Sequence, residues 1–416
     1  MESVRVLHIN TWGGIGGAFI ASNRLHQALL SSGIDSVLAY GRIINNSDAG
    51  LKSSNLYRKI KAENKFENLS IKVCKRLGLN DIGNISSFSL REQEYFSRAS
   101  VLNFHNLHSN YFSYLSLPAL TEDKPAIWTL HDMWSFTGHC AYSYDCSRWQ
   151  TGCGKCPYPD SQPAIRRDAT DLEWRLKNWV YSRSNITVVT PSSWLESQVK
   201  QSMLNRFPIH HIPNGIDTAV YQPLDPEQCK ALLGVANGKK VLMFGAQMLA
   251  DLRKGSDLLV KALSSLPASL KAETILLILG EGGEAIAEAV GMQTLNLGYV
   301  SSDRLKAICY CAADLFIFPT RADNLPLVLQ ESMACGTPMV SFKIGGVSDL
   351  VRPGITGYLA EPEDAKDFCN GIVQLLEDRF ERARMRQQCR AIALEEFPLE
   401  LQAKRYIDLY GQLVQT

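Results

Sequence analysis

Short apolar runs recur along the chain, and segments with helical spacing separate them. The runs lack strict alternation of apolar and polar residues, which is typical of strands buried on both faces of a parallel sheet. Their interleaving with helices predicts an α/β fold of doubly wound, Rossmann-like sheets. The predicted strands are residues 4–10, 35–40, 101–104, 126–130, 186–190, 210–213, 241–244, 274–279, 315–318 and 339–342.

A chain of 416 residues is too long for one ordinary core, so we expect two such domains facing a cleft. The two series of strands divide near residue 215, which places the first domain at residues 1–215 and the second at 216–395. The amphipathic end, residues 396–416, is predicted to be a helix that closes back on the first domain. The first domain also contains a loop module at 139–160 and a polar insertion with one or two helices at 45–100.

The formal net charge of +1 provides no basic field for binding nucleic acid. No run of about 18 apolar residues predicts a transmembrane helix, and the start of the chain lacks a signal-peptide pattern, so we expect a cytosolic protein. Basic runs at residues 58–65 and 72–76 favour a solvated helix face, with attraction to a membrane surface as the alternative.

A glycine-rich segment, residues 13–18, connects the first predicted strand to a helix. Glycines let a ligand approach the backbone, and a helix N-terminus offers free N–H groups. The segment is not the dinucleotide fingerprint, because Phe19 stands where a third glycine or alanine is due and no acidic residue ends the second strand. A tight turn without a ligand is the alternative.

Arg253 and Lys254 lie in a loop after the strand predicted at 241–244. A guanidinium fork and a lysine charge both suit a diphosphate, and ligands of doubly wound sheets bind at the carboxyl ends of strands. We therefore predict an anion site in this loop, with a solvated charged loop as the alternative.

Asp323 and Glu331 follow the strand predicted at 315–318 and flank an apolar helical segment. A carboxylate accepts two hydrogen bonds at once, as a vicinal diol requires, so the pair predicts a ligand rich in hydroxyl groups. An ordinary surface carboxylate and a helix N-terminal charge are the alternatives.

Three histidines follow predicted strands. His131 and Asp132 come directly after residues 126–130, and His105 and His108 follow residues 101–104 in the same way. We expect one or two of these histidines to reach a cleft, with a core histidine held by Asp132 as the alternative.

Four cysteines, Cys140, Cys146, Cys153 and Cys156, lie close together in the loop module. The two-residue gap between Cys153 and Cys156 lets both sulfurs face one ion, so the spacing predicts a structural zinc with all four positions filled. Buried free thiols are the alternative, and redox chemistry ranks third because no thioredoxin-like pattern surrounds the pair.

Together these segments resemble the retaining GT-B glycosyltransferases of family 4 over nearly the full length of the chain. The histidine–cysteine segment, residues 131–157, resembles a bacterial branch that builds surface polysaccharides and exopolysaccharides, including colanic-acid-type enzymes. The segments that carry the resemblance are residues 16–18, 103–108, 128–132, 189–194, 213–217, 253–255, 280–282, 323–331 and 345–346.

The resemblance implies a role for each of five residues. Glu331 is expected to hold the ribose hydroxyls of the nucleotide, and Asp323 to contact the donor sugar, where the family commonly has the longer glutamate. Lys254 is expected on the diphosphate, and His131 to face the transferred sugar. Because the family's usual arginine after the preceding strand is missing, Arg253 is expected to replace it.

The resemblance also implies a set of residues that line the nucleotide. Gly16 and Gly17 are expected on the phosphate and acceptor side of the cleft. The full expected nucleotide-binding set is Glu331, Gly16, Gly17, Gly245, Leu327 and Val328.

The implied reaction moves a sugar from a UDP- or GDP-sugar to a glycan or polyprenyl-linked acceptor, with retention of configuration and no catalytic metal. The first domain would take the acceptor and the second the nucleotide sugar, and a lipid-linked acceptor would imply peripheral contact with the cytoplasmic membrane. Three alternatives stay open: a nicotinamide dehydrogenase, a sugar-nucleotide epimerase that needs no acceptor, and a non-enzymatic partner-binding protein.

Overall fold

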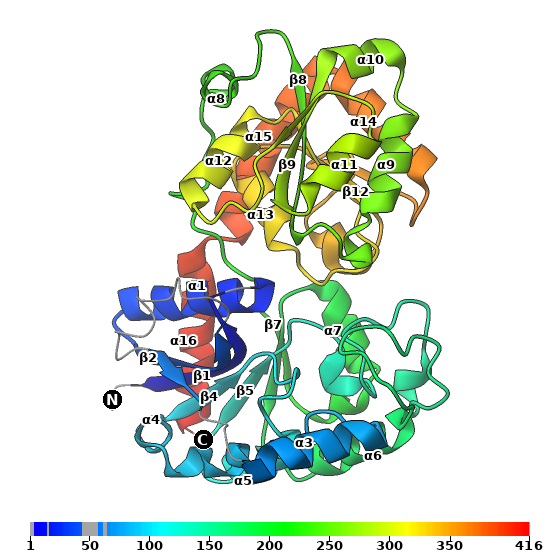
Figure 1. The fold of residues 1–416 in the computed structure, drawn as a ribbon. Coiled ribbons are helices and arrows are strands. Elements are labelled where there is room, and N and C mark those ends of the chain that lie inside the picture. Colours follow the sequence, from blue (N-terminus) through cyan, green and yellow to red (C-terminus); the bar gives the residue numbers. More distant parts are fainter. Residues whose placement is uncertain (1–3, 15, 44–56, 61–64, 416) are drawn as a thin grey trace. The chain divides into compact units, whose positions relative to one another are not determined.

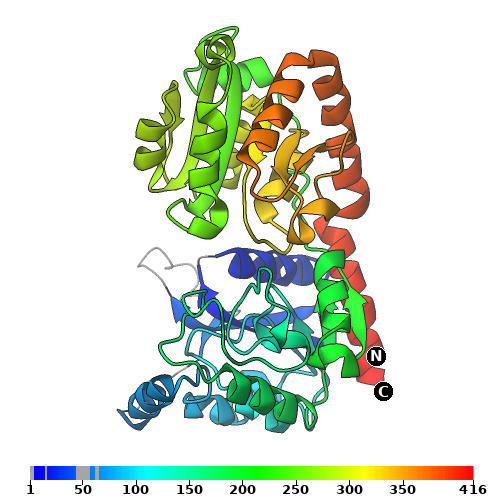
Figure 2. The same ribbon diagram turned by 90° about the vertical axis from the view of Figure 1, so that its right-hand side faces the viewer.

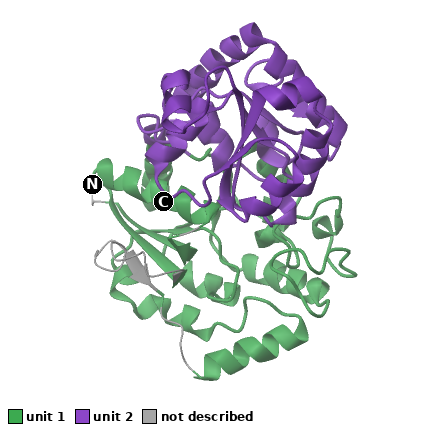
Figure 3. Cartoon of the chain, turned by 45° about the horizontal axis from the view of Figure 1, so that its top comes forward, with its two compact units in different colours: residues 1–214, 402–416 green, residues 215–401 purple. Residues whose placement is uncertain are grey.

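The computed structural model describes residues 4–14, 16–43, 57–60 and 65–415, so parts of the predicted insertion, of the glycine-rich segment and of the first basic run lie outside the described residues. The chain forms two compact units, shown in Figure 3. Unit 1 comprises residues 1–214 and 402–416, and unit 2 comprises residues 215–401. The cleft predicted between two domains stays a prediction.

Unit 1 is built on a parallel sheet with the strand order β3-β2-β1-β4-β5-β6-β7. The order reverses between β1 and β4, because the chain first builds outward on one side and then crosses to the other (Figure 1). The strands are β1 (Arg5–Gly13), β2 (Asp35–Ile43), β3 (Tyr57–Lys59), β4 (Val101–Phe104), β5 (Ala126–Thr129), β6 (Thr187–Thr190) and β7 (Ile209–His211). The helices are α1 (Gly17–Ser31), α3 (Lys65–Leu77), α4 (Glu94–Ser97), α5 (Leu117–Leu120), α6 (Thr170–Tyr181), α7 (Ser193–Lys200) and most of α16 (Leu399–Gln415).

Unit 2 repeats this plan with the strand order β10-β9-β8-β11-β12-β13, all parallel, which reverses between β8 and β11. The strands are β8 (Lys240–Met248), β9 (Thr274–Glu281), β10 (Thr294–Asn296), β11 (Leu315–Phe318), β12 (Met339–Phe342) and β13 (Gly357–Ala360). The helices are α8 (Pro226–Leu232), α9 (Ser256–Ser264), α10 (Ala268–Glu273), α11 (Gly283–Ala289), α12 (Asp303–Ala312), α13 (Leu327–Ala334), α14 (Ala365–Glu377) and α15 (Arg379–Glu396).

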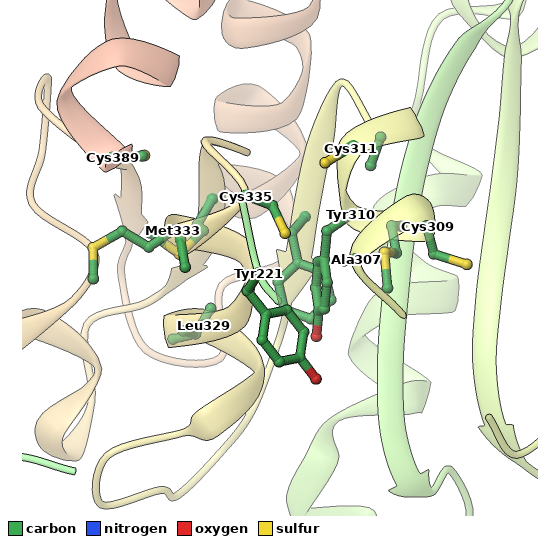
Figure 4. Close-up of a cluster of buried hydrophobic side chains, with 14 of the residues drawn as sticks. Tyr221, Ala307, Cys309, Tyr310, Cys311, Leu329, Met333, Cys335 and Cys389 are labelled. Atoms are coloured by element: carbon green, nitrogen blue, oxygen red, sulfur yellow. The ribbon is translucent and has the colours of Figure 1, made fainter. Parts of the chain in front are cut away.

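The sheet of unit 2 is covered on both faces. Alternate residues of β11 enter different cores: Leu315 and Ile317 pack in one, and Phe316 and Phe318 in the other. All four side chains are fully buried, which explains the continuous apolar run in the sequence. Figure 4 shows part of the second core, where two cysteines of α12 and Cys335, just after α13, pack among Tyr310, Leu329 and Met333 as ordinary core residues.

The closing helix α16 packs on the sheet of unit 1, as predicted. Its Tyr410 hydroxyl accepts a hydrogen bond from Asn103 at 2.8 Å, and its Tyr406 hydroxyl lies 2.9 Å from the hydroxyl of Thr129. Both tyrosines are fully buried with Val6, Val101 and Ile127 on one face of the sheet. Because each buried hydroxyl has a partner, the last helix is fixed to the first sheet by specific contacts.

The structure corrects two features of the expected fold. β1 continues through Thr11 to Gly13, beyond the end predicted at residue 10. The edge strands β3, β10 and β13 were not predicted, since each has only three or four residues and little apolar pattern. None of the helices in the described part of the chain is both long enough and apolar enough to cross a membrane.

Candidate functional site

The loops that follow β8 and β11 are joined side by side in unit 2. The Arg253 carbonyl accepts hydrogen bonds from the backbone N–H of Arg321 at 2.8 Å and from the Thr320 hydroxyl at 3.0 Å. Gly255 has φ +73°, and a Cβ there would lie 1.8 Å from the Pro319 carbonyl oxygen, so this approach requires glycine. The two loops therefore meet at the point where the strand order reverses, where ligands bind in doubly wound sheets.

The side chains of these loops form a compact charged cluster. Lys254 Nζ lies 2.6 Å from Asp323 Oδ2, and Arg253 Nη1 lies 3.2 Å from the same oxygen. Arg253 also pairs with Asp251 at 3.2 Å and donates to the Ala322 carbonyl at 2.8 Å. Three of the predicted site residues are thus brought together, although 69 residues separate Lys254 from Asp323 in the chain.

Burial and charge act against each other in this cluster. Burial raises the pKa of Asp323, but the charges of Lys254 and Arg253 outweigh burial and hold that pKa below its usual value. Burial and the nearby Arg253 charge lower the pKa of Lys254, while Asp323 opposes them. The three groups therefore form an ionic unit that an incoming anion would rearrange.

A glycine turn after β12 holds the backbone of Asp323. Gly346 donates its N–H to the Asp323 carbonyl at 3.2 Å. Gly345 has φ +48°, and a Cβ there would lie 2.1 Å from the same carbonyl oxygen. Only glycine permits this contact, which explains the glycine pair at residues 345–346.

Glu331 lies on α13 and is nearly buried, with 4% of its surface exposed. Its Oε2 accepts a hydrogen bond from Tyr310 at 3.2 Å, and burial together with the Glu331 charge raises the pKa of that tyrosine well above its usual value. Leu327 and Val328 form the first turn of the same helix and are half-buried. Gly245 lies inside β8 and is buried, with Leu279 beside the position of a Cβ.

Unit 1 presents its own loops at its reversal of strand order. Thr11, near the end of β1, donates its hydroxyl to the carbonyls of Asn106 and His108 at 2.9 and 3.1 Å, which ties β1 to the loop after β4. Gly16 caps α1 with φ +93°. In the part of the chain that the structure describes, no atom beyond the chain neighbours would lie within 4 Å of a Cβ at Gly16 or Gly17, so the start of α1 has room beside its backbone.

Three histidines from neighbouring strands form a hydrogen-bonded row. His8 Nδ1 lies 3.0 Å from His105 Nε2, and His105 Nδ1 lies 3.0 Å from His131 Nε2. Burial lowers the pKa of all three, that of His131 to about 4, so the row is uncharged at neutral pH. The sequence analysis singled out His131 and His105 but missed His8. The only signal for His8 in the sequence is that this polar residue lies inside the strand predicted at residues 4–10.

His108 makes a separate pair with Asp132. Its Nε2 lies 3.0 Å from Asp132 Oδ2, and burial favours the uncharged imidazole, but Asp132 and Asp81 raise the pKa of His108 overall. A small pocket within unit 1 is lined by His105, His108 and His131, together with Trp134. The cleft that one or two of these histidines were expected to reach stays a prediction.

The structure does not show the zinc site predicted at the four cysteines of the loop module, and this zinc stays a prediction. Among the described residues, no group of three or more histidine, cysteine, aspartate or glutamate side chains is arranged to hold a metal ion. Cys153 Sγ accepts from the Gly138 N–H at 3.2 Å, and Cys156 Sγ lies 3.1 Å from His139 Nε2. Burial raises the pKa of Cys140 to about 12, which favours the thiol. The charges of Cys146, Cys153 and Cys156 all act on the pKa of Cys140, so the four side chains gather in one part of the module.

Comparison with known proteins identifies the family. Residues 15–220 match the family described as Glycosyltransferase Family 4, and residues 230–392 match Glycosyl transferases group 1. The chain belongs to these glycosyltransferases. The two matches account for most of the chain and divide it near the boundary between the units.

Relatives of this glycosyltransferase include proteins of surface polysaccharide biosynthesis. WcaC of Escherichia coli (strain K12), named as a colanic acid biosynthesis glycosyl transferase, is 26% identical over 86% of this chain and 88% of its own length. The lipopolysaccharide 1,2-N-acetylglucosaminetransferase of Salmonella typhimurium is 27% identical over 53% of this chain and 60% of its own length.

Solved structures share the GT-B fold of this glycosyltransferase. A sucrose-phosphate synthase from Thermosynechococcus elongatus superposes with a TM-score of 0.73 at 18% identity, with 99% of both chains covered. HepE of Anabaena in complex with UDP superposes with a TM-score of 0.68 at 17% identity, over 99% of this chain and 100% of HepE. The expected α/β GT-B fold is confirmed.

Proposed function

We propose that this glycosyltransferase moves a hexosyl group from a UDP- or GDP-sugar to a glycan or polyprenyl-linked acceptor, with retention of anomeric configuration, in surface polysaccharide biosynthesis. The observation that carries the proposal is the convergence of Arg253, Lys254 and Asp323 at the reversal of strand order in unit 2. Two cations and a carboxylate at this point suit a diphosphate joined to a hydroxylated sugar. The complexes of HepE with UDP and with UDP-glucose support a nucleotide-sugar donor.

The charges of the cluster suit the chemistry of transfer. Breaking the bond from the anomeric carbon to the diphosphate leaves negative charge on the phosphate oxygens and positive charge on the sugar. Lys254 and Arg253 would stabilise the leaving diphosphate without a divalent ion. When the diphosphate pairs with Lys254 and Arg253, Asp323 would lose these ion pairs and could accept hydrogen bonds from sugar hydroxyls.

In a single displacement without a covalent intermediate, retention requires the acceptor to attack from the face that the diphosphate leaves. The acceptor oxygen forms the new bond to the anomeric carbon, and its proton passes to a leaving phosphate oxygen, so no protein base is needed. His131 would hold the transferred sugar by a hydrogen bond from its neutral imidazole. Glu331 would hold the ribose diol, while Gly16 and Gly17 would serve the acceptor side at the start of α1.

Labelled UDP- and GDP-sugars incubated with purified protein and a bacterial lipid extract test the proposal. We expect radioactivity to move from the nucleotide to the lipid or glycan fraction, and the anomeric coupling constant of the product to match that of the donor. An isomerised nucleotide sugar formed without acceptor would instead identify an epimerase. Tight binding of reduced nicotinamide without any sugar nucleotide would point to a dehydrogenase.

A further inference from the structure

Helix α3 of unit 1 exposes an apolar stripe. Phe66, Leu69, Val73 and Leu77 are 77%, 60%, 48% and 49% exposed. Their spacing of three, four and four residues places them on one face of the helix. A surface helix normally turns such a face toward the core, so an exposed stripe of this length indicates an interaction surface.

The helix is held to unit 1 by its polar side instead. Glu67 is 4% exposed, and its Oε1 accepts hydrogen bonds from the backbone N–H and the hydroxyl of Ser86 at 3.1 and 2.7 Å. The backbone of Ile71 packs against Gly83, where an added Cβ would lie 2.8 Å away. The inward face of α3 is therefore set by a buried carboxylate, and the outward direction of the apolar stripe follows from that anchor.

The exposed surface of α3 is also strongly basic. Lys65, Lys72, Lys75 and Arg76 are all exposed, whereas Glu67, the helix's one acidic residue, is buried. Four cations beside an apolar stripe, with no exposed carboxylate on the helix, match an anionic and partly apolar partner.

Helix α6 lies near α3 and also exposes apolar side chains. Gly78, just after α3, packs against the Arg167 carbonyl ahead of α6, where an added Cβ would lie 2.3 Å away. α6 exposes Leu172 and Trp179, two turns apart, and the Arg183 guanidinium lies 4.3 Å from the Trp179 ring. An exposed tryptophan beside a cation is typical of the boundary between lipid headgroups and acyl chains. Figure 1 shows α3 and α6 at the same edge of unit 1, and α3 projects from that edge in Figure 2.

We propose that α3, with the exposed face of α6, docks unit 1 on a bilayer surface rich in anionic phospholipid. The apolar stripe would enter the headgroup boundary while the flanking cations pair with lipid phosphates. A second copy of the chain is a poorer occupant, because a symmetric dimer would bring the four cations of each α3 against those of its partner. Docking would bring the glycosyltransferase to lipid-linked acceptors.

Vesicle co-sedimentation of the full-length protein tests this docking. Vesicles of phosphatidylcholine alone are compared with vesicles of equal parts phosphatidylcholine and phosphatidylglycerol, at low and high salt. We expect the wild type to sediment with the anionic vesicles and to be released by salt. The double variants Leu69→Ser/Val73→Ser and Lys72→Gln/Lys75→Gln should each weaken binding at least roughly tenfold. The matched controls are Leu232→Ser, at a 73% exposed position on α8, and Lys261→Gln on α9, and both should bind like the wild type.

Several results would overturn the docking proposal. The proposal fails if the wild-type protein stays in solution with anionic vesicles at low salt, or if it binds both vesicle types equally. It also fails if both α3 variants bind anionic vesicles as well as the wild type does. Light scattering that finds a dimer in the wild type and a monomer in Leu69→Ser/Val73→Ser would assign the face to a second copy. The assay needs neither donor nor acceptor, so its failure leaves the proposed transfer reaction untouched.

Discussion

His105 Nδ1 lies 3.0 Å from His131 Nε2, and this contact determines which nitrogen of His131 carries its proton. Each neutral imidazole has one N–H and one acceptor nitrogen, so the N–H groups of the row must all point the same way. At the inner end, His8 Nε2 is buried without a hydrogen-bond partner among the described residues. A buried acceptor without a partner is better tolerated than a buried N–H, so the row should run from His8 to His131.

The first prediction is that His131 carries its proton on Nδ1 and presents an N–H donor. Nitrogen NMR of histidine-labelled protein at neutral pH should report this tautomer in the wild type. His105→Phe keeps an aromatic ring beside His131 but removes the acceptor–donor contact, and should yield a mixture of both tautomers. His211→Phe, on an exposed strand end, is the control. An identical His131 tautomer in the His105→Phe variant would contradict the argument.

The second prediction concerns the leaving group. Lys254→Gln removes one of the two cations of the cluster, and transfer should fall roughly 10²–10³-fold in kcat, the typical cost of losing one preorganised transition-state donor. The fold should survive, because Arg253 still pairs with Asp323. Lys261→Gln on the surface of α9 is the matched control. A kcat of Lys254→Gln equal to that of the wild type would show that Lys254 does not stabilise the leaving group. We also expect transfer to persist in the presence of a chelator.

The third prediction is that Glu331 contributes to binding of the donor ribose but little to the stability of the fold. Glu331→Gln keeps an acceptor for Tyr310 but loses the charge, so the donor should bind more weakly by roughly 1.5–3 kcal/mol while the melting temperature changes little. A donor lacking the ribose 2′-hydroxyl should bind poorly to the wild type and lose little further in the variant. Glu288→Gln, exposed on α11, should behave as the wild type. If the variant lost as much further affinity for the deoxy donor as it loses for the normal donor, Glu331 would not contact the ribose 2′-hydroxyl.

The fourth prediction is a pH dependence of stability. Asp132 raises the pKa of His108 in the folded state, so their pairing stabilises the fold fully below the unfolded pKa of histidine and is lost as pH rises through the folded pKa. In turn His108 outweighs burial and lowers the pKa of Asp132, so that contribution fades as pH falls through the folded pKa of the acid. Asp132→Asn should therefore cost roughly 1.5–3 kcal/mol at mildly acidic pH and less at alkaline pH, measured by denaturant unfolding. A cost that does not vary with pH would exclude the ion pair.

The fifth prediction concerns the cysteine module. The spacing of the four cysteines predicts a structural zinc, so elemental analysis of purified protein should find about one equivalent of zinc. A chelator should then lower the melting temperature of the wild type, and Cys153→Ser should lower it without a chelator. Well under one equivalent of zinc, with no effect of the chelator on stability, would identify the cysteines as free thiols.

Local patterns in the sequence were sufficient to predict most of the scaffold. The strands predicted at 315–318 and 339–342 became β11 and β12 with the predicted bounds, because strands buried on both faces are mostly apolar. The short edge strands were missed, since three or four residues with one buried face carry too little periodicity.

The sequence by itself determined the alternation of strands and helices, the residue types that suit a diphosphate and a diol, and the family. Only the tertiary structure decided that Lys254 pairs with Asp323, that His8 extends the histidine row, and that α3 turns its apolar face outward. The physical reason is that these outcomes depend on which strands become neighbours and which side chain anchors a helix. Hydrophobic periodicity records that a face is apolar, but contacts between residues distant in sequence determine what that face meets.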